Sequence, residues 1–132
     1  MGEKEMTLEQ CEVLLKEISS QIEELLTKRE NLLIQWNKAF DKQTDNITRC
    51  EYERNGDSFW LYLINGEYKL EVCNIYKGDL DKSADELYHR IETSIIIHNV
   101  KNRREELTDI QTNLVLGKVA EIRNSLIDQK DN

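Results

Sequence analysis

Residues 59–75, FWLYLINGEYKLEVCNI, contain two β-rich runs joined at Asn65-Gly66. An Asn-Gly pair accepts the positive φ angles of a type I′ turn, whose twist matches that of paired strands. The first run is apolar on both faces, which is typical of a central strand covered on two sides. The stretch therefore predicts a β-hairpin at the centre of the fold.

A third strand is predicted immediately before this hairpin. Charged and less polar residues alternate from Ile47 to Arg54, and Asn55-Gly56 supplies a second tight turn. Three short strands joined by two tight turns predict an antiparallel β-meander over residues 47–76. Such a small sheet cannot bury both of its faces by itself, so other elements must cover it.

A long amphipathic helix is predicted before the meander, over residues 7–42. Thr7 and Gln10 have the spacing of a capping box, with Thr7 as the N-cap. Arg29 is the one charged residue in the apolar seam, where it either specifies register or extends its charge to the edge. The a and d positions of this coiled-coil-like repeat are Leu8, Cys11, Leu15, Ile18, Ile22, Leu25, Arg29, Leu32, Trp36 and Ala39.

One further helix is predicted over residues 83–129, opened by a capping box from Ser83 to Glu86. Its distal part nearly equals the first helix in length, and we expect the two to pair as an antiparallel coiled-coil-like arm. The early turns remain to cover one face of the sheet. The chain is thus expected to form a single α+β domain over residues 1–132, with a long helix, a three-stranded antiparallel meander and a second long helix.

The second face of the predicted sheet carries Trp60, Tyr62 and Ile64 and has no cover in this arrangement. Exposed aromatic faces of this size are uncommon on monomers, so we expect these residues to form a homodimer interface. Base stacking by Trp36 or Trp60 is an alternative. Both residues, however, occupy apolar positions of their helix and strand patterns, and packing is the commoner role for such residues.

The composition excludes several classes of function. The net charge is −8, which argues against a surface that coats nucleic acid throughout. Cys11, Cys50 and Cys73 have no metal-binding or redox spacing, and His89 and His98 are isolated. The sequence has no nucleophile motif, phosphate loop, secretion signal or bilayer-length apolar window. We therefore expect a cytoplasmic protein that is not an enzyme and uses no cofactor, metal, small-molecule substrate or membrane.

Part of the chain resembles the YbaB/EbfC family of nucleoid-associated proteins. The resemblance covers roughly residues 60–105 and depends on an apolar strand ending in Ile64-Asn65-Gly66, a strand carrying Cys73 and Ile75, and the spacing of Leu80, Leu87 and Ile91. It implies a dimer of helix–three strands–helix chains. It also implies non-specific DNA binding by the helices, and hence a location in the nucleoid.

The candidate DNA contacts are the basic cluster Lys101, Arg103 and Arg104, together with Lys38 and Lys42. The predicted helix pairing brings these five residues together, where they would contact phosphates without reading base sequence. The alternative is a solvated helix face neutralised by the acidic residues that follow, Glu105, Glu106 and Asp109.

An alternative function is also open at this point. The long heptad-bearing helix is suited to holding a protein partner, and the helix–hairpin–helix outline is shared with small prefoldin-type chaperone subunits. The sequence therefore predicts a DNA-binding homodimer, with a protein-interaction module as the alternative.

Overall fold

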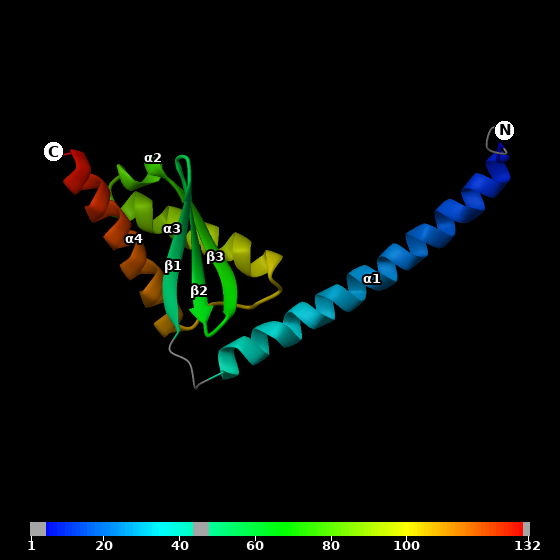
Figure 1. The fold of residues 1–132 in the computed structure, drawn as a ribbon, viewed down its shortest axis with the longest axis horizontal. Helices are drawn as coiled ribbons and strands as arrows, with labels where there is room; N and C mark the ends of the chain where they lie inside the picture. The colour runs from blue at the N-terminus through cyan, green and yellow to red at the C-terminus, as the bar shows by residue number, and fades with distance from the viewer. Residues whose placement is uncertain (1–4, 44–47, 131–132) are drawn as a thin grey trace.

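The structure, a computed structural model, describes residues 5–43 and 48–130 and has an α+β fold. Its elements in chain order are α1 (Leu8–Lys42), β1 (Arg49–Asn55), β2 (Ser58–Asn65), β3 (Tyr68–Tyr76), α2 (Lys77–Leu80), α3 (Ala84–Lys101) and α4 (Asp109–Lys130). The predicted long first helix and three-stranded antiparallel sheet are confirmed. Ile47, the predicted first residue of the meander, lies outside the described residues. Figure 1 shows α1 extending away from a body formed by the sheet and the other helices.

The sheet is an antiparallel meander in the order β1-β2-β3. Asn55 pairs with Ser58 and Asn65 pairs with Tyr68, so each loop consists of two residues, Gly56-Asp57 and Gly66-Glu67. Only the glycine in each loop has a positive φ, 63° and 64°. This is the pattern of a type II′ turn rather than the predicted type I′, because the asparagine ends the strand instead of entering the turn.

The hydrophobic core lies between one face of the sheet and the helices α3 and α4. Phe59, Leu61 and Leu63 of β2 point into it and are at most 2% exposed. Leu87 and Ile91 of α3 and Val115, Val119 and Ile122 of α4 belong to the same cluster. In Figure 1, α3 crosses behind the strands and α4 lies beside β1.

The predicted single helix over residues 83–129 is wrong, because the helical structure is interrupted between Lys101 and Asp109. Arg103 adopts a φ of 57°, the one left-handed non-glycine residue in the described ranges, and α4 starts in a new direction. Thr108 and Gln111 form a capping box there, with reciprocal bonds of 3.0 and 3.2 Å. This box is a sequence signal for a second helix start that the heptad pattern concealed.

The predicted antiparallel arm of two helices is also wrong for a single chain. α4 packs on β1 and β2, and it points away from α1 rather than along it (Figure 1). The physical reason is that Val115, Val119 and Ile122 bury almost completely against the sheet. A seam with α1 would have left the sheet's apolar face in water.

The free edge of β3 is covered by polar side chains of α3. The Ser94 hydroxyl accepts the Asn74 N–H at 2.8 Å and donates to the Asn74 carbonyl at 3.1 Å. Farther along, Asn102 donates to the Glu71 carbonyl at 2.9 Å. The edge strand therefore has internal partners for backbone groups that would otherwise pair with another strand.

The variant Ser94→Ala tests this edge closure. Because Asn74 would lose both partners in a buried place, we expect the free energy of unfolding to fall by about 1–3 kcal/mol. Urea unfolding followed by circular dichroism measures it. Ser20→Ala, on the exposed side of α1, is the control and should shift stability by no more than about 0.5 kcal/mol. Equal stability of the two variants would contradict the assigned role of Ser94.

Candidate partner-binding surface on the first helix

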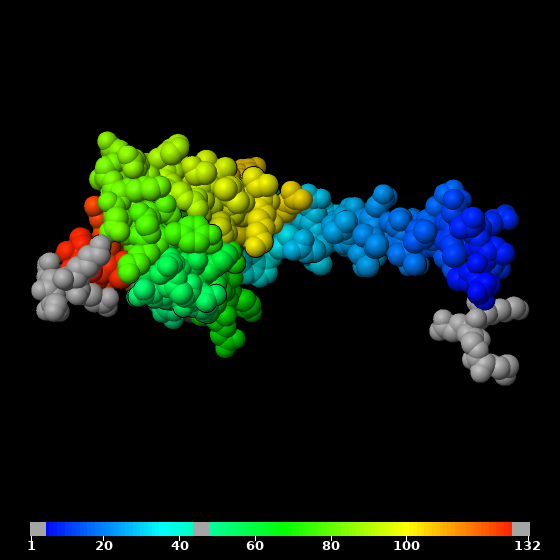
Figure 2. All heavy atoms as spheres, turned by 90° about the horizontal axis from the view of Figure 1, so that it is seen from above, coloured from blue at the N-terminus to red at the C-terminus, as the bar shows by residue number. Residues whose placement is uncertain are grey.

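The first helix projects as an isolated rod over most of its length. It has 35 residues and starts at a complete capping box, in which Gln10 and Thr7 exchange hydrogen bonds of 3.0 and 3.1 Å. At 1.5 Å per residue it is about 50 Å long. Figure 2 shows most of this rod standing clear of the body, with contact confined to its C-terminal end.

The apolar seam of α1 is largely uncovered. We call its a and d positions from Leu8 to Leu32 the free stripe; its residues are Leu8, Cys11, Leu15, Ile18, Ile22, Leu25, Arg29 and Leu32. Leu8 is 86% exposed, and Leu25 and Leu32 are each 64% exposed. The flanking Leu14 and Leu26 are exposed as well. A largely apolar surface of this kind, exposed to solvent, marks an interaction site.

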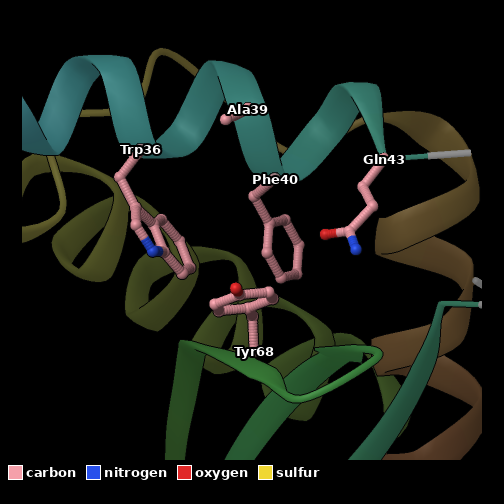
Figure 3. A pocket seen from close by; sticks show the side chains of 5 residues that line it. All are labelled: Trp36, Ala39, Phe40, Gln43 and Tyr68. Carbon is pink, nitrogen blue, oxygen red and sulfur yellow. The ribbon is translucent and has the colours of Figure 1, made fainter.

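The free stripe ends where α1 reaches the body. Trp36, Ala39 and Phe40 face Tyr68 at the tip of the β2–β3 hairpin, and Gln43 closes the same hollow of about 290 Å³ (Figure 3). The rings of Trp36 and Phe40 stack with centroids 5.0 Å apart. Phe40 is buried, and Trp36 packs against the core cluster. Trp36 therefore has the predicted packing role.

Asn65, the residue that suggested the turn, holds the end of α1. Its side-chain amide donates to the Phe40 carbonyl at 2.9 Å and to the Gln43 carbonyl at 3.1 Å. The last carbonyls of a helix have no partner within the helix. Asn65, which is 1% exposed, bonds to these two carbonyls and attaches the end of α1 to the sheet.

A second attachment joins α1 to the connection between α3 and α4. We call it the clasp, and it consists of Asn37, Asp41, Arg104 and Gln111. One Arg104 nitrogen donates to both Asp41 carboxylate oxygens, at 2.9 and 3.1 Å, and the other donates to Asn37 Oδ1 at 3.0 Å. Gln111 donates to Asp41 Oδ1 at 2.9 Å. Asn37 also donates to the Asn102 carbonyl.

The clasp was not foreseen from the sequence. Asn37 and Asp41 have the pattern of polar positions on α1, and Arg104 has that of a basic surface residue. The one signal in the sequence is the Thr108–Gln111 capping box, which places Gln111 in the first turn of α4. Nothing in the local pattern indicates that α1 and α4 meet through an arginine between them.

The five predicted DNA contacts occupy different environments. The Arg104 side chain is only 4% exposed and is bound in the clasp. Arg103 pairs with Glu30 at 3.1 Å, and Lys101 lies 3.9 Å from Glu71. Lys38 and Lys42 are exposed.

Three of the five basic residues lie together in the structure, as predicted, and two do not. Lys38, Arg103 and Arg104 line one open cleft of about 400 Å³, and Asp41, Glu105 and Glu106 line it too. Lys42 and Lys101 are not part of its lining. The cleft thus has both charge signs, as the solvated-face alternative anticipated.

The three predicted dimer residues are partly covered within one chain. Ile64 is 4% exposed, whereas Trp60 and Tyr62 are half-buried. The Trp60 and His98 rings pack in a T-shaped arrangement with centroids 6.4 Å apart, and the Lys69 ammonium lies 5.2 Å from the centre of the Tyr62 ring. α3 therefore contributes to covering the face that had no cover in the predicted arrangement, and Ile64 has little surface left for a partner.

Comparisons of the chain with protein-family models, with curated proteins and with solved structures found no match. Within residues 5–43 and 48–130, no three histidine, cysteine or acidic side chains gather as they would around a metal ion. In those same ranges, no helix has the length and apolar character needed to cross a bilayer.

Arg104→Ala tests whether the clasp positions α1. The substitution leaves the buried Asn37 oxygen without its donor and Asp41 without its cation, so we expect a loss of about 1–3 kcal/mol in unfolding free energy. In the same variant, amide hydrogen exchange over residues 34–42 should become faster. Arg103→Asn is the matched control, since asparagine tolerates the left-handed conformation and the Arg103–Glu30 pair is exposed. A DNA contact at Arg104 would instead change affinity with stability intact.

Proposed function

We propose that this chain is a protein-interaction module whose first helix binds a partner helix in a coiled coil. The observation that carries the proposal is the exposure of the free stripe on a helix whose contacts with the body, among the described residues, lie toward its C-terminal end. A coiled coil needs a/d apolar residues at a 3.5-residue spacing on a helix free to approach another. The free stripe has that spacing over residues 8–32, and Figure 2 shows this part of α1 clear of the body.

The body serves this function by presenting α1. Asn65 and the clasp attach the last two turns of α1 to the sheet and to the α3–α4 connection. They leave the preceding turns unhindered. Most of the stability of a helix in a protein comes from packing of its apolar face, so burial of the free stripe by a partner would also stabilise the helix itself. Binding and helix order are therefore expected to rise together.

DNA binding through Lys38, Lys42, Lys101, Arg103 and Arg104 remains a prediction, and the geometry supports it less. Three of these residues have carboxylate partners, and one of the three is buried. The exposed Lys38 and Lys42 are the observation that keeps this function open. The homodimer through Trp60, Tyr62 and Ile64 also remains a prediction. The same holds for the resemblance to nucleoid-associated proteins, the cytoplasmic location and the absence of enzyme activity.

The double variant Ile18→Asp/Ile22→Asp tests the interaction function. Two carboxylates in the middle of the stripe should abolish association of the chain, with itself or with protein from its host. We expect the melting temperature of the body to stay unchanged, because both side chains are exposed and far from it. Light scattering and affinity capture with nuclease present measure the loss.

The control for this experiment is Ser20→Asp/Thr27→Asp, which adds the same charge to the opposite, polar side of α1. This variant should associate like the wild type. If the stripe variant keeps every association of the wild type, the proposed function is wrong.

DNA binding makes a separate prediction. If it occurs, Lys38→Glu/Lys42→Glu should weaken binding of a duplex and flatten its salt dependence, by about 0.9 in the logarithmic slope for each phosphate that is no longer neutralised. Fluorescence anisotropy at two salt concentrations measures both quantities. Lys16→Glu/Lys28→Glu, elsewhere on α1, makes the same change in net charge and is the control. Wild-type affinity in the double variant would remove Lys38 and Lys42 from the candidate site.

A further inference from the structure

We propose that the free stripe of α1 is covered by the free stripe of a second copy of this chain, running antiparallel. The inference rests on the proposed coiled-coil function and names its partner. The free stripe begins at Leu8 and stops at Leu32, because Trp36 and Ala39 already face the body. Its length of about 37 Å thus defines how far two copies can overlap.

The order of residues in the free stripe fits an antiparallel copy of itself. When Leu8 lies opposite Leu32 of the second copy, Leu15 lies opposite Leu25 and Ile18 lies opposite Ile22. Antiparallel coiled coils pair a with d positions in this way, so each of these layers is formed by two aliphatic side chains. The two residues of the stripe that are not aliphatic, Cys11 and Arg29, then fall opposite each other.

A parallel pair in register gives a different seam. Arg29 would face Arg29 of the second copy, with two like charges in an apolar interface, which is costly. In the antiparallel pair each arginine faces the small Cys11 instead. Glu12, one position from Cys11, then lies near the guanidinium. Arg29 thus selects the orientation of the pair, the register role open to a charged a-position residue.

The charges outside the seam favour the same orientation. Lys16 comes level with Glu23 and Glu24 of the second copy, and Lys28 comes level with Glu12. All three basic residues of residues 8–32, including Arg29, therefore come level with acidic residues of the second copy. In a parallel pair each lysine would be level with the identical lysine. Complementary charge of this kind discriminates orientations even where single surface pairs contribute little affinity.

The bodies lie far apart in this pairing. In the antiparallel overlap they lie at opposite ends of the two-helix segment, with the two Asn37 residues about 50 Å apart. The N-terminus of each α1 reaches the other helix near Leu32, one turn before the aromatic contacts with Tyr68 begin. The expected dimer is elongated, with one body at each end of a two-helix coiled coil.

Cross-linking tests orientation and register with the full-length chain. Cys11 is the natural probe, because it is partly exposed whereas Cys50 and Cys73 are buried. Burial raises the pKa of Cys50 to about 12 and that of Cys73 to about 11, so both thiols react slowly with maleimides. In the antiparallel pair, two Cys11 thiols are separated by about 27 Å along the helix axis.

We expect wild-type chain to have twice the monomer mass by light scattering, and to give no covalent dimer with a short bis-maleimide. Arg29→Cys should give a covalent dimer, because the new thiol lies opposite Cys11. Arg29→Cys/Cys11→Ser should again give none. A monomeric wild type, a covalent wild-type dimer or a covalent dimer of the double variant would each overturn the proposal.

These outcomes are distinct from failure of the proposed function. A monomeric wild type whose association with host protein is lost in Ile18→Asp/Ile22→Asp would rule out the second copy and retain the coiled-coil function. Association that persists in that variant would rule out the coiled-coil function itself.

Discussion

The direction of α1 depends on the Arg104 guanidinium, which lies between the end of α1 and the start of α4. It is 4% exposed, and its donors reach Asn37 and both oxygens of Asp41. Removing such a cation from water costs free energy unless acceptors surround it. Here the acceptors come from α1 and from Gln111 of α4, whose Oε1 accepts from Arg104 at 3.2 Å, and these two helices otherwise touch little. The same charge that opposes burial therefore determines where α1 meets the body.

The body and α1 differ in whether their apolar surfaces are buried within the chain. The helical residues after Ala84 cover one sheet face, protect the β3 edge and reach Trp60 through His98. Most apolar residues of the body thereby pack within the body, although Ile96, Ile97, Val100 and Ile110 are exposed. The N-terminal three-quarters of α1 have no such use. Their heptad pattern is therefore explained by something outside the chain, which is the basis of both proposals.

Local signals predicted local structure well. The Thr7–Gln10 box set the start of α1, and the two Asn-Gly pairs located both hairpins, although glycine alone enters each turn. The break at Arg103 could not be predicted in the same way, because a left-handed arginine has no sequence signature. Arg104 looked like surface charge, since its acceptor Asp41 lies far away in sequence. Burial of a charge depends on tertiary packing, and the sequence pattern contains only the residue type.

The pairing of Ser94 with the backbone of Asn74 also limits how this protein can aggregate. Strand addition requires an open sheet edge with unpaired backbone groups. On the β3 side those groups are partly occupied by α3. On the β1 side, four of the seven residues, Arg49, Glu51, Glu53 and Arg54, are charged, which disfavours stacking against an identical strand. Fibril growth through the sheet is thus opposed at both edges, even though the chain displays a long apolar helix.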